Sequence, residues 1–197
     1  MKKYFFLLTL FLLPSTLHAG KFDGISVGAG IGANTAALKE KSTPDSLKQF
    51  GANGKIYVGV GKNFLDLIFI GAEGFGRYSF FVKQPDTMKE NVEGAPQFGG
   101  YIKAGIRPTE NLLIYALYGF QTNTVKIKNA FNNLFEPTDG TLNSMVGLGC
   151  EYAFALGAAL RVEGVYEPEI PFKIKDVPHM EYNTSFFSIN LGLVLYL

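Results

Sequence analysis

The sequence contains little of several residue types that would mark other classes of protein. Its single cysteine among 197 residues excludes a disulfide framework and a cysteine-ligated metal site. Charged residues make up only 18% of the chain and the formal net charge is +1, which removes the electrostatic basis for nonspecific binding to nucleic acid. Tryptophan is absent, and beyond residue 19 no apolar run is long enough to cross a membrane as a helix.

Glycine and aromatic residues are abundant instead. The chain has 23 glycines, 18 phenylalanines and 10 tyrosines, and 47% of its residues are hydrophobic. This composition favours strands and tight turns over a helical bundle, and it is too apolar for a disordered chain.

The first 19 residues have the order of a secretory signal peptide. Two lysines precede the apolar run 4–13, Pro14 follows it, and small and polar residues continue to Ala19. The run is too short to span a bilayer as a helix, so we predict cleavage after Ala19; a buried N-terminal helix is the alternative. An exported, apolar chain without a transmembrane helix fits a β-barrel in an outer membrane.

Eight segments alternate between apolar residues and polar or small ones with the period of a strand. In the first segment, Ile25 and Val27 alternate with Ser26 and Gly28. We therefore predict an all-β domain over residues 20–197, an eight-stranded antiparallel, up-and-down transmembrane β-barrel with its apolar side chains toward lipid. The predicted strands are 22–34, 52–61, 66–82, 97–107, 111–124, 142–154, 157–167 and 185–197.

The inward face is ambiguous in two of these segments. In 66–82, the frame that places the charged residues inside also places Leu67, Phe69 and Phe75 inside. In 111–124 the opposite frame is nearly as good as the one we favour. The favoured frame points these residues outward: Ile114, Ala116, Tyr118 and Phe120.

Long and short connections alternate along the chain without exception. This is expected when one end of a barrel faces the periplasm and the other faces the exterior. The short turns are 62–65, 108–110 and 155–156, and the long loops are 35–51, 83–96, 125–141 and 168–184.

The same alternation would also fit a soluble lipocalin-like barrel with the two faces exchanged, so that the apolar side chains lie inside and the charged ones face water. The alternation of loop lengths disfavours it, and so do aromatic residues near the strand ends, which suit interfacial girdles. These aromatics are Phe50, Phe64, Phe80, Phe98, Tyr152, Phe154, Tyr166, Phe186 and Tyr196.

The predicted interior carries equal numbers of acidic and basic side chains. An eight-stranded barrel is just wide enough to be filled by side chains, and isolated charges there would cost several kcal/mol each, on the order of the penalty for any buried ion. We therefore expect a hydrogen-bonded network that closes the barrel, with a narrow charged pore as the alternative. The network residues are Glu73, Arg77, Lys103, Arg107, Glu151, Arg161, Glu163 and Glu167.

The sequence resembles the opacity-protein and OmpA-type family of small outer-membrane β-barrels. The resemblance rests on 149–152 (GCEY) followed by 160–163 (LRVE), on 112–119 after the turn 107–111, and on the C-terminal segment 190–197. The C-terminal segment is similar to the family's signal for the outer-membrane assembly machinery, although that signal usually ends in an aromatic residue. The resemblance implies a signal formed by Asn190, Gly192, Leu195 and Leu197.

The chain offers few residues for catalysis, and we predict no enzyme, no cofactor and no metal site. Beyond the signal peptide the one histidine is His179, and a lipid-modifying enzyme would need it to act with Ser185 or Ser188, with Glu181 orienting the ring. Cys150 is predicted to face lipid as a small hydrophobe. The glycines at 28–32 lie within a strand, so a nucleotide-binding loop is excluded.

These patterns predict a monomeric surface protein of a Gram-negative outer membrane, exported by its signal peptide. Under the family resemblance its four long external loops would serve adhesion, contact with a host or cell-surface ligand, or envelope integrity. Its expected partners are outer-membrane lipid and the assembly machinery, and not nucleic acid. The alternatives are the lipid-modifying enzyme centred on His179 and a narrow diffusion pore.

Overall fold

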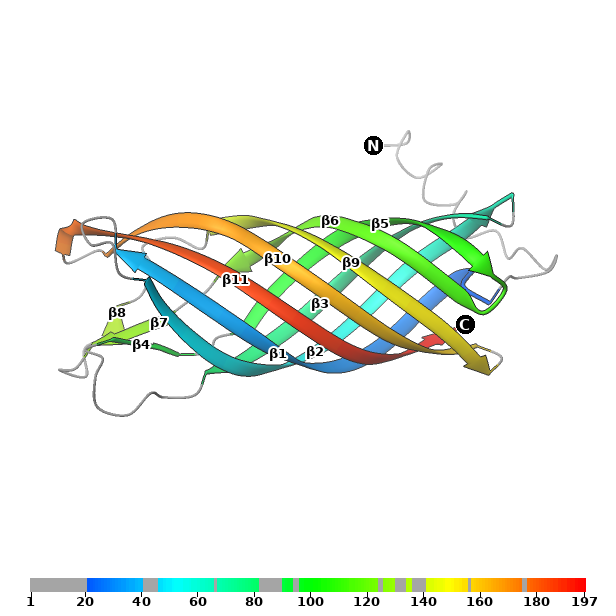
Figure 1. Ribbon diagram of the computed structural model, residues 1–197, viewed down its shortest axis with the longest axis horizontal. Helices are drawn as coiled ribbons and strands as arrows, with labels where there is room; N and C mark the ends of the chain where they lie inside the picture. The colour runs from blue at the N-terminus through cyan, green and yellow to red at the C-terminus, as the bar shows by residue number, and fades with distance from the viewer. Residues whose placement is uncertain are drawn as a thin grey trace, which may run out of the picture.

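Eight antiparallel strands close into a barrel, and the first strand pairs with the last (Figure 1). Around the barrel the order is β1, β11, β10, β9, β6, β5, β3 and β2. This computed structural model describes residues 21–40, 46–65, 67–81, 90–93, 96–123, 126–129, 134–135, 141–155, 157–174 and 177–197. The barrel strands are β1 (Gly24–Glu40), β2 (Ser46–Phe64), β3 (Ile68–Phe81), β5 (Pro96–Thr109), β6 (Leu112–Asn123), β9 (Thr141–Ala155), β10 (Ala158–Ile174) and β11 (Val177–Tyr196).

The predicted fold class is therefore confirmed. The predicted signal peptide lies outside the described residues. Within the described part of the chain, no helix has the length and apolar character needed to cross a membrane. Three further strands form a small sheet apart from the barrel: β4 (Glu90–Glu93), β7 (Lys126–Asn129) and β8 (Leu134–Phe135).

The barrel closes along an unbroken ladder between β1 and β11. The Cα partners run from Ser26 opposite Tyr196 to Glu40 opposite Tyr182. At the end of the ladder the amide of Leu197 donates a hydrogen bond to the carbonyl of Ile25, 2.8 Å away. Both described ends of the chain therefore lie at the short-turn end of the barrel.

The described side chains of the barrel strands alternate between the barrel interior and its outer surface. On β3 the burial pattern places Glu73 and Arg77 inside, and Phe69 and Phe75 are buried with them. Leu67 departs from that frame: it lies in the turn before β3 and is 52% exposed. On β6 the favoured frame is confirmed. Its outward residues are Ile114, Ala116, Tyr118 and Phe120.

Glycines on the inner face make room for the large side chains. A Cβ built on Gly149 would lie 2.5 Å from the ring of Tyr115, and one on Gly61 would lie 2.4 Å from the ring of Phe69. Because real Cβ atoms do not approach other atoms so closely, these positions accept only glycine while the aromatic rings stay in place.

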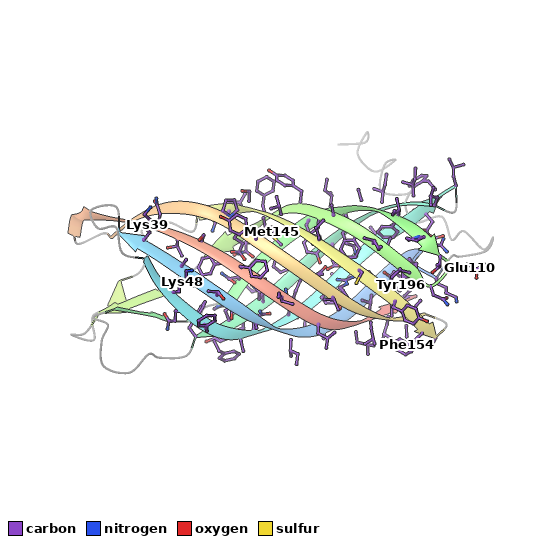
Figure 2. All side chains as sticks on the ribbon, viewed as in Figure 1. Lys39, Lys48, Glu110, Met145, Phe154 and Tyr196 are labelled. Carbon is purple, nitrogen blue, oxygen red and sulfur yellow. The ribbon has the colours of Figure 1, made fainter. Side chains whose placement is uncertain are left out.

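Two of the predicted long loops are largely strand. The ladder between β1 and β2 continues to Lys39 opposite Ser46, and that between β10 and β11 continues to Ile174 opposite Val177. The ranges 35–51 and 168–184 are therefore mostly extensions of hairpins, whereas the ranges 83–96 and 125–141 contain the small separate sheet. Figure 2 shows Lys39 and Lys48 toward this long-loop end of the barrel, with Glu110, Phe154 and Tyr196 at the opposite end.

Apart from Tyr118, the exposed aromatic side chains of the described residues lie toward the two ends of the outer surface, as in interfacial girdles. Phe186 and Tyr196 do not belong to them: Phe186 is 4% exposed, and Tyr196 contacts buried residues inside the barrel. Those on the long-loop side are Phe50, Tyr78, Phe80, Phe98, Phe120, Tyr166 and Phe187, and those on the short-turn side are Phe64, Tyr152 and Phe154.

Candidate functional site

The centre of the barrel interior is a compact network of buried ion pairs around Arg161. Its guanidinium lies 2.8 Å from Glu73, 3.0 Å from Glu151 and 3.6 Å from Glu163. These four residues come from β3, β9 and β10, and the side chains of the three carboxylates are at most 1% exposed.

Two lysines complete the charge balance of this central network. Lys103 lies 3.2 Å from both Glu73 and Glu151, and Lys55 lies 2.8 Å from Glu163. Each buried carboxylate therefore has a cation at contact distance, which offsets the cost of removing it from water.

Tyrosine hydroxyls donate further hydrogen bonds to the same carboxylates. Tyr115 donates to Glu163 over 2.8 Å, and Tyr101 donates to Glu73 and accepts a 3.0 Å bond from Lys55. Tyr196 donates to Glu151. The guanidinium of Arg161 also stacks 4.1 Å from the ring centre of Tyr57, so the network is enclosed by aromatic rings.

A second ion pair lies nearer the long-loop end. Arg77 and Glu167 are 2.6 Å apart, and two glutamines fix their orientation. Gln97 accepts a 2.8 Å bond from Arg77, and Gln121 accepts from Arg77 and donates to Glu167.

The predicted set of interior charges needs one correction. Arg107 is only half-buried, makes no ion pair with any described residue, and lies 5.8 Å from the ring of Phe22 at the short-turn end. Lys55 takes its place in the charge balance. The alternation in 52–61 places Lys55 inward, so the sequence pattern contained the signal for it. The structure brings the other seven residues into the two groups described above: Glu73, Lys103, Glu151, Arg161 and Glu163 in the first, Arg77 and Glu167 in the second.

The interior is layered along the barrel axis. On the long-loop side of the central network several amide side chains are buried, and the polar side-chain atoms of Asn53 and Asn143 have no hydrogen-bond partner among the described residues. On the short-turn side the buried residues other than Ser26 are apolar, and they include Phe69, Leu113, Ala153, Ala159 and Val194.

The residues before β1 cover the short-turn end. Phe22 is fully buried and makes an edge-to-face contact with Tyr196, with ring centres 5.7 Å apart. On either side of it, Lys21 donates to the side chain of Asn111, and Asp23 accepts a 2.6 Å bond from the backbone of Asn63. The segment therefore acts as a plug that adds to the apolar layer.

The residues considered for catalysis do not form a described site. The side chains of His179 and Glu181 lie outside the described residues, while Ser188 is buried inside the barrel and Ser185 alternates outward. Cys150 is exposed on the outer surface. Among the described residues, no group of three or more histidine, cysteine or acidic side chains could hold a metal ion.

The residues of the resemblance-based assembly signal divide between the two faces of β11. Asn190 is buried and Gly192 faces inward, whereas Leu195 and Leu197 are exposed on the outer surface. This division follows the alternation of the strand.

A family model described as "Outer membrane protein beta-barrel domain" matches residues 5–194. The chain belongs to this family. No curated protein matches it. Its barrel is similar to the crystal structure of Neisserial surface protein A, with a TM-score of 0.58, 14% identity, and coverage of 89% of this chain and 98% of that one. It also matches Ail of Yersinia pestis, with a TM-score of 0.46, 14% identity and coverage of 86% and 99%.

Membership of this family, together with the closed eight-stranded barrel, places the protein in a Gram-negative outer membrane. The outward apolar surface then faces lipid and the paired charges are shielded from it. In outer-membrane barrels the short turns face the periplasm and the longer loops face the exterior.

Proposed function

We propose that the protein works at the cell surface through its long-loop end, in adhesion or in envelope integrity, and that its interior is a structural plug. The observation that carries this proposal is the filled interior. Arg161 reaches carboxylates on three strands, and Phe22 covers the periplasmic end, so little of the interior is left for transport.

The extended hairpins support the same proposal. β1 and β2 pair beyond the outward aromatic residue Phe50, and β10 and β11 pair beyond Tyr166, so both hairpins project past the girdle on the exterior side. Strand pairing outside the membrane stiffens a surface that can contact another cell or molecule.

The test exchanges surface loops while keeping the barrel. In one variant, residues 83–95 and 125–140 are replaced by short glycine–serine turns, and attachment of the bacteria to host cells is compared with that of the parent. Sensitivity to detergents and bile salts is measured in parallel as the readout of envelope integrity. Loss of either property with normal heat-dependent gel mobility supports the proposal; full retention of both would contradict it.

We also propose that the protein is a monomer without catalytic activity. An unchanged lipid A profile in the His179→Ala variant, compared with the parent and with a deletion strain, is the expected result. A lipid A modification that depends on His179 would overturn this part of the proposal.

A further inference from the structure

The outer surface of the barrel carries an apolar groove that the proposed surface function does not use. The groove is shallow and largely open to its surroundings, with a volume of about 920 Å³. We call it the outer groove, and it lies over residues of β2, β3, β5 and β6. Its main lining residues are Val58, Gly74, Gly100, Ile102, Tyr118 and Phe120.

Two paired glycines form the floor of the outer groove. Gly74 and Gly100 are Cα partners in the β3–β5 ladder, so two adjacent outward positions lack side chains. A Cβ built on Gly74 would lie 3.9 Å from the backbone oxygen of Gly99, an ordinary van der Waals contact, so the position has room for a side chain that it lacks. The outward side chains on either side of this pair are Val58 on β2, the partner of Gly74, and Phe120 on β6, the partner of Gly100, and they are 56% and 45% exposed.

The polarity of the outer groove fits a hydrocarbon chain. Glu73 and Tyr101 contribute only backbone, because their side chains point inward and are buried in the central network. Of the side chains that line it from outside, only Tyr118 carries a polar atom. The groove runs along the outer surface from Phe120, in the long-loop set of outward aromatics, toward the short-turn end, and on a barrel in a membrane this surface faces lipid.

An exposed lysine lies near the end of the outer groove, where the headgroup of a lipid would be if its acyl chain occupied the groove. The groove extends to Ile25 and Val60, which are partners near the periplasmic ends of β1 and β2. Lys62 is exposed and lies two residues beyond Val60 on the same outward face. An ammonium at this position complements a phosphate near the periplasmic interface.

We propose that the outer groove binds one acyl chain of an anionic phospholipid from the periplasmic leaflet, with the headgroup phosphate at Lys62. The glycine floor lets the chain lie directly on the backbone of β3 and β5. The bound acyl chain then contacts the backbone of Glu73 and Tyr101 from outside the barrel. The side chains of these two residues point inward and belong to the central network.

The test uses the mature protein extracted into mild detergent with phosphatidylglycerol present, and native mass spectrometry counts the lipids it retains. Gly74→Leu fills the groove. Gly164→Leu is the matched control. Like Gly74, Gly164 faces outward, but it lies on β10, away from the groove, and a Cβ built on it would have nothing within 4 Å. Lys62→Gln removes the cation, and Lys39→Gln removes an exposed lysine at the other end of the barrel.

We expect the parent, Gly164→Leu and Lys39→Gln to retain one phosphatidylglycerol per chain. Gly74→Leu should lose it, and Lys62→Gln should lose the preference for phosphatidylglycerol over phosphatidylcholine. Should Gly74→Leu fail to fold by gel mobility, the comparison of Lys62→Gln with Lys39→Gln decides the question. A parent without bound lipid, equal retention in all variants, or a dimer of chains that Gly74→Leu dissociates would each overturn the proposal.

Discussion

Arg161 and Glu73 meet across the full width of the barrel, with Nη1 and Oε1 2.8 Å apart. Their strands, β10 and β3, are four positions apart in either direction around the eight-stranded ring. This contact therefore joins opposite walls of the barrel, and the other buried charges are arranged around it.

Replacing Arg161 by methionine should strongly destabilise the barrel. The change leaves Lys103 as the one described cation in contact with the two buried carboxylates of Glu73 and Glu151. Breaking a buried ion pair in this way costs about 3–5 kcal/mol. The free energy of unfolding is measured by urea titration in lipid vesicles, followed by gel mobility. Lys39→Met, at an exposed position, is the control and should change it by less than about 0.5 kcal/mol. Equal stability of the two variants would show that the central network contributes little.

Truncating Phe22 should loosen the periplasmic end of the barrel. Phe22→Ala removes a fully buried ring from its contact with Tyr196, and such a change costs about 3 kcal/mol. Hydrogen exchange of the backbone amides near Ile25 and Leu197 should speed up, because their hydrogen bond closes the same end. Unchanged exchange at these amides would mean that the plug does not support the closing ladder.

Two neighbouring amides should respond in opposite ways to the same substitution. Asn143 and Gln121 are Cα partners on β9 and β6, and both side chains are buried. Gln121 is hydrogen-bonded to Arg77 and Glu167, whereas the amide of Asn143 has no partner in the described part of the chain. We expect Gln121→Leu to destabilise the barrel by about 2 kcal/mol and Asn143→Leu to stabilise it by about 1 kcal/mol. Urea titration of both variants provides the measurement; a loss of stability in Asn143→Leu would reveal a partner for that amide, such as bound water.

The filled interior should make the barrel electrically silent. An ion crossing the barrel would have to pass the central network and then the apolar layer that includes Phe69 and Leu113. We expect no steady single-channel steps from the purified protein in a planar bilayer, with a general porin measured under the same conditions as the positive control. Reproducible steps from the parent protein would favour the narrow pore instead.

The alternation of side chains made most of the barrel predictable, because a strand in lipid has one face in hydrocarbon and the other inside. It left β3 ambiguous, since the rule assumes a polar interior and Phe69 belongs to an apolar layer at the periplasmic end. The extended hairpins were predicted as loops because strands beyond the membrane no longer need an apolar face. Residues near Ala36 and Thr184 therefore lack a clear pattern, although both are buried.

The composition of the central network was less predictable than its location. Which charges meet depends on how far the strands are staggered around the ring, and no single segment contains that information. Arg107 was included because its alternation is inward, yet its position near the turn places it beside Phe22 and away from the carboxylates. The stagger of the strands also brings Lys55 into contact with Glu163, which lies 108 residues away in the chain.

The ion pair between opposite strands of the barrel also limits how the sequences of related barrels can change during evolution. Glu73 and Arg161 are 88 residues apart in the chain, so a change of sign at one of them requires a compensating change in a distant hairpin. Lumenal residues should consequently change in coordinated sets and covary across homologues, whereas lipid-facing positions should exchange one aliphatic residue for another independently.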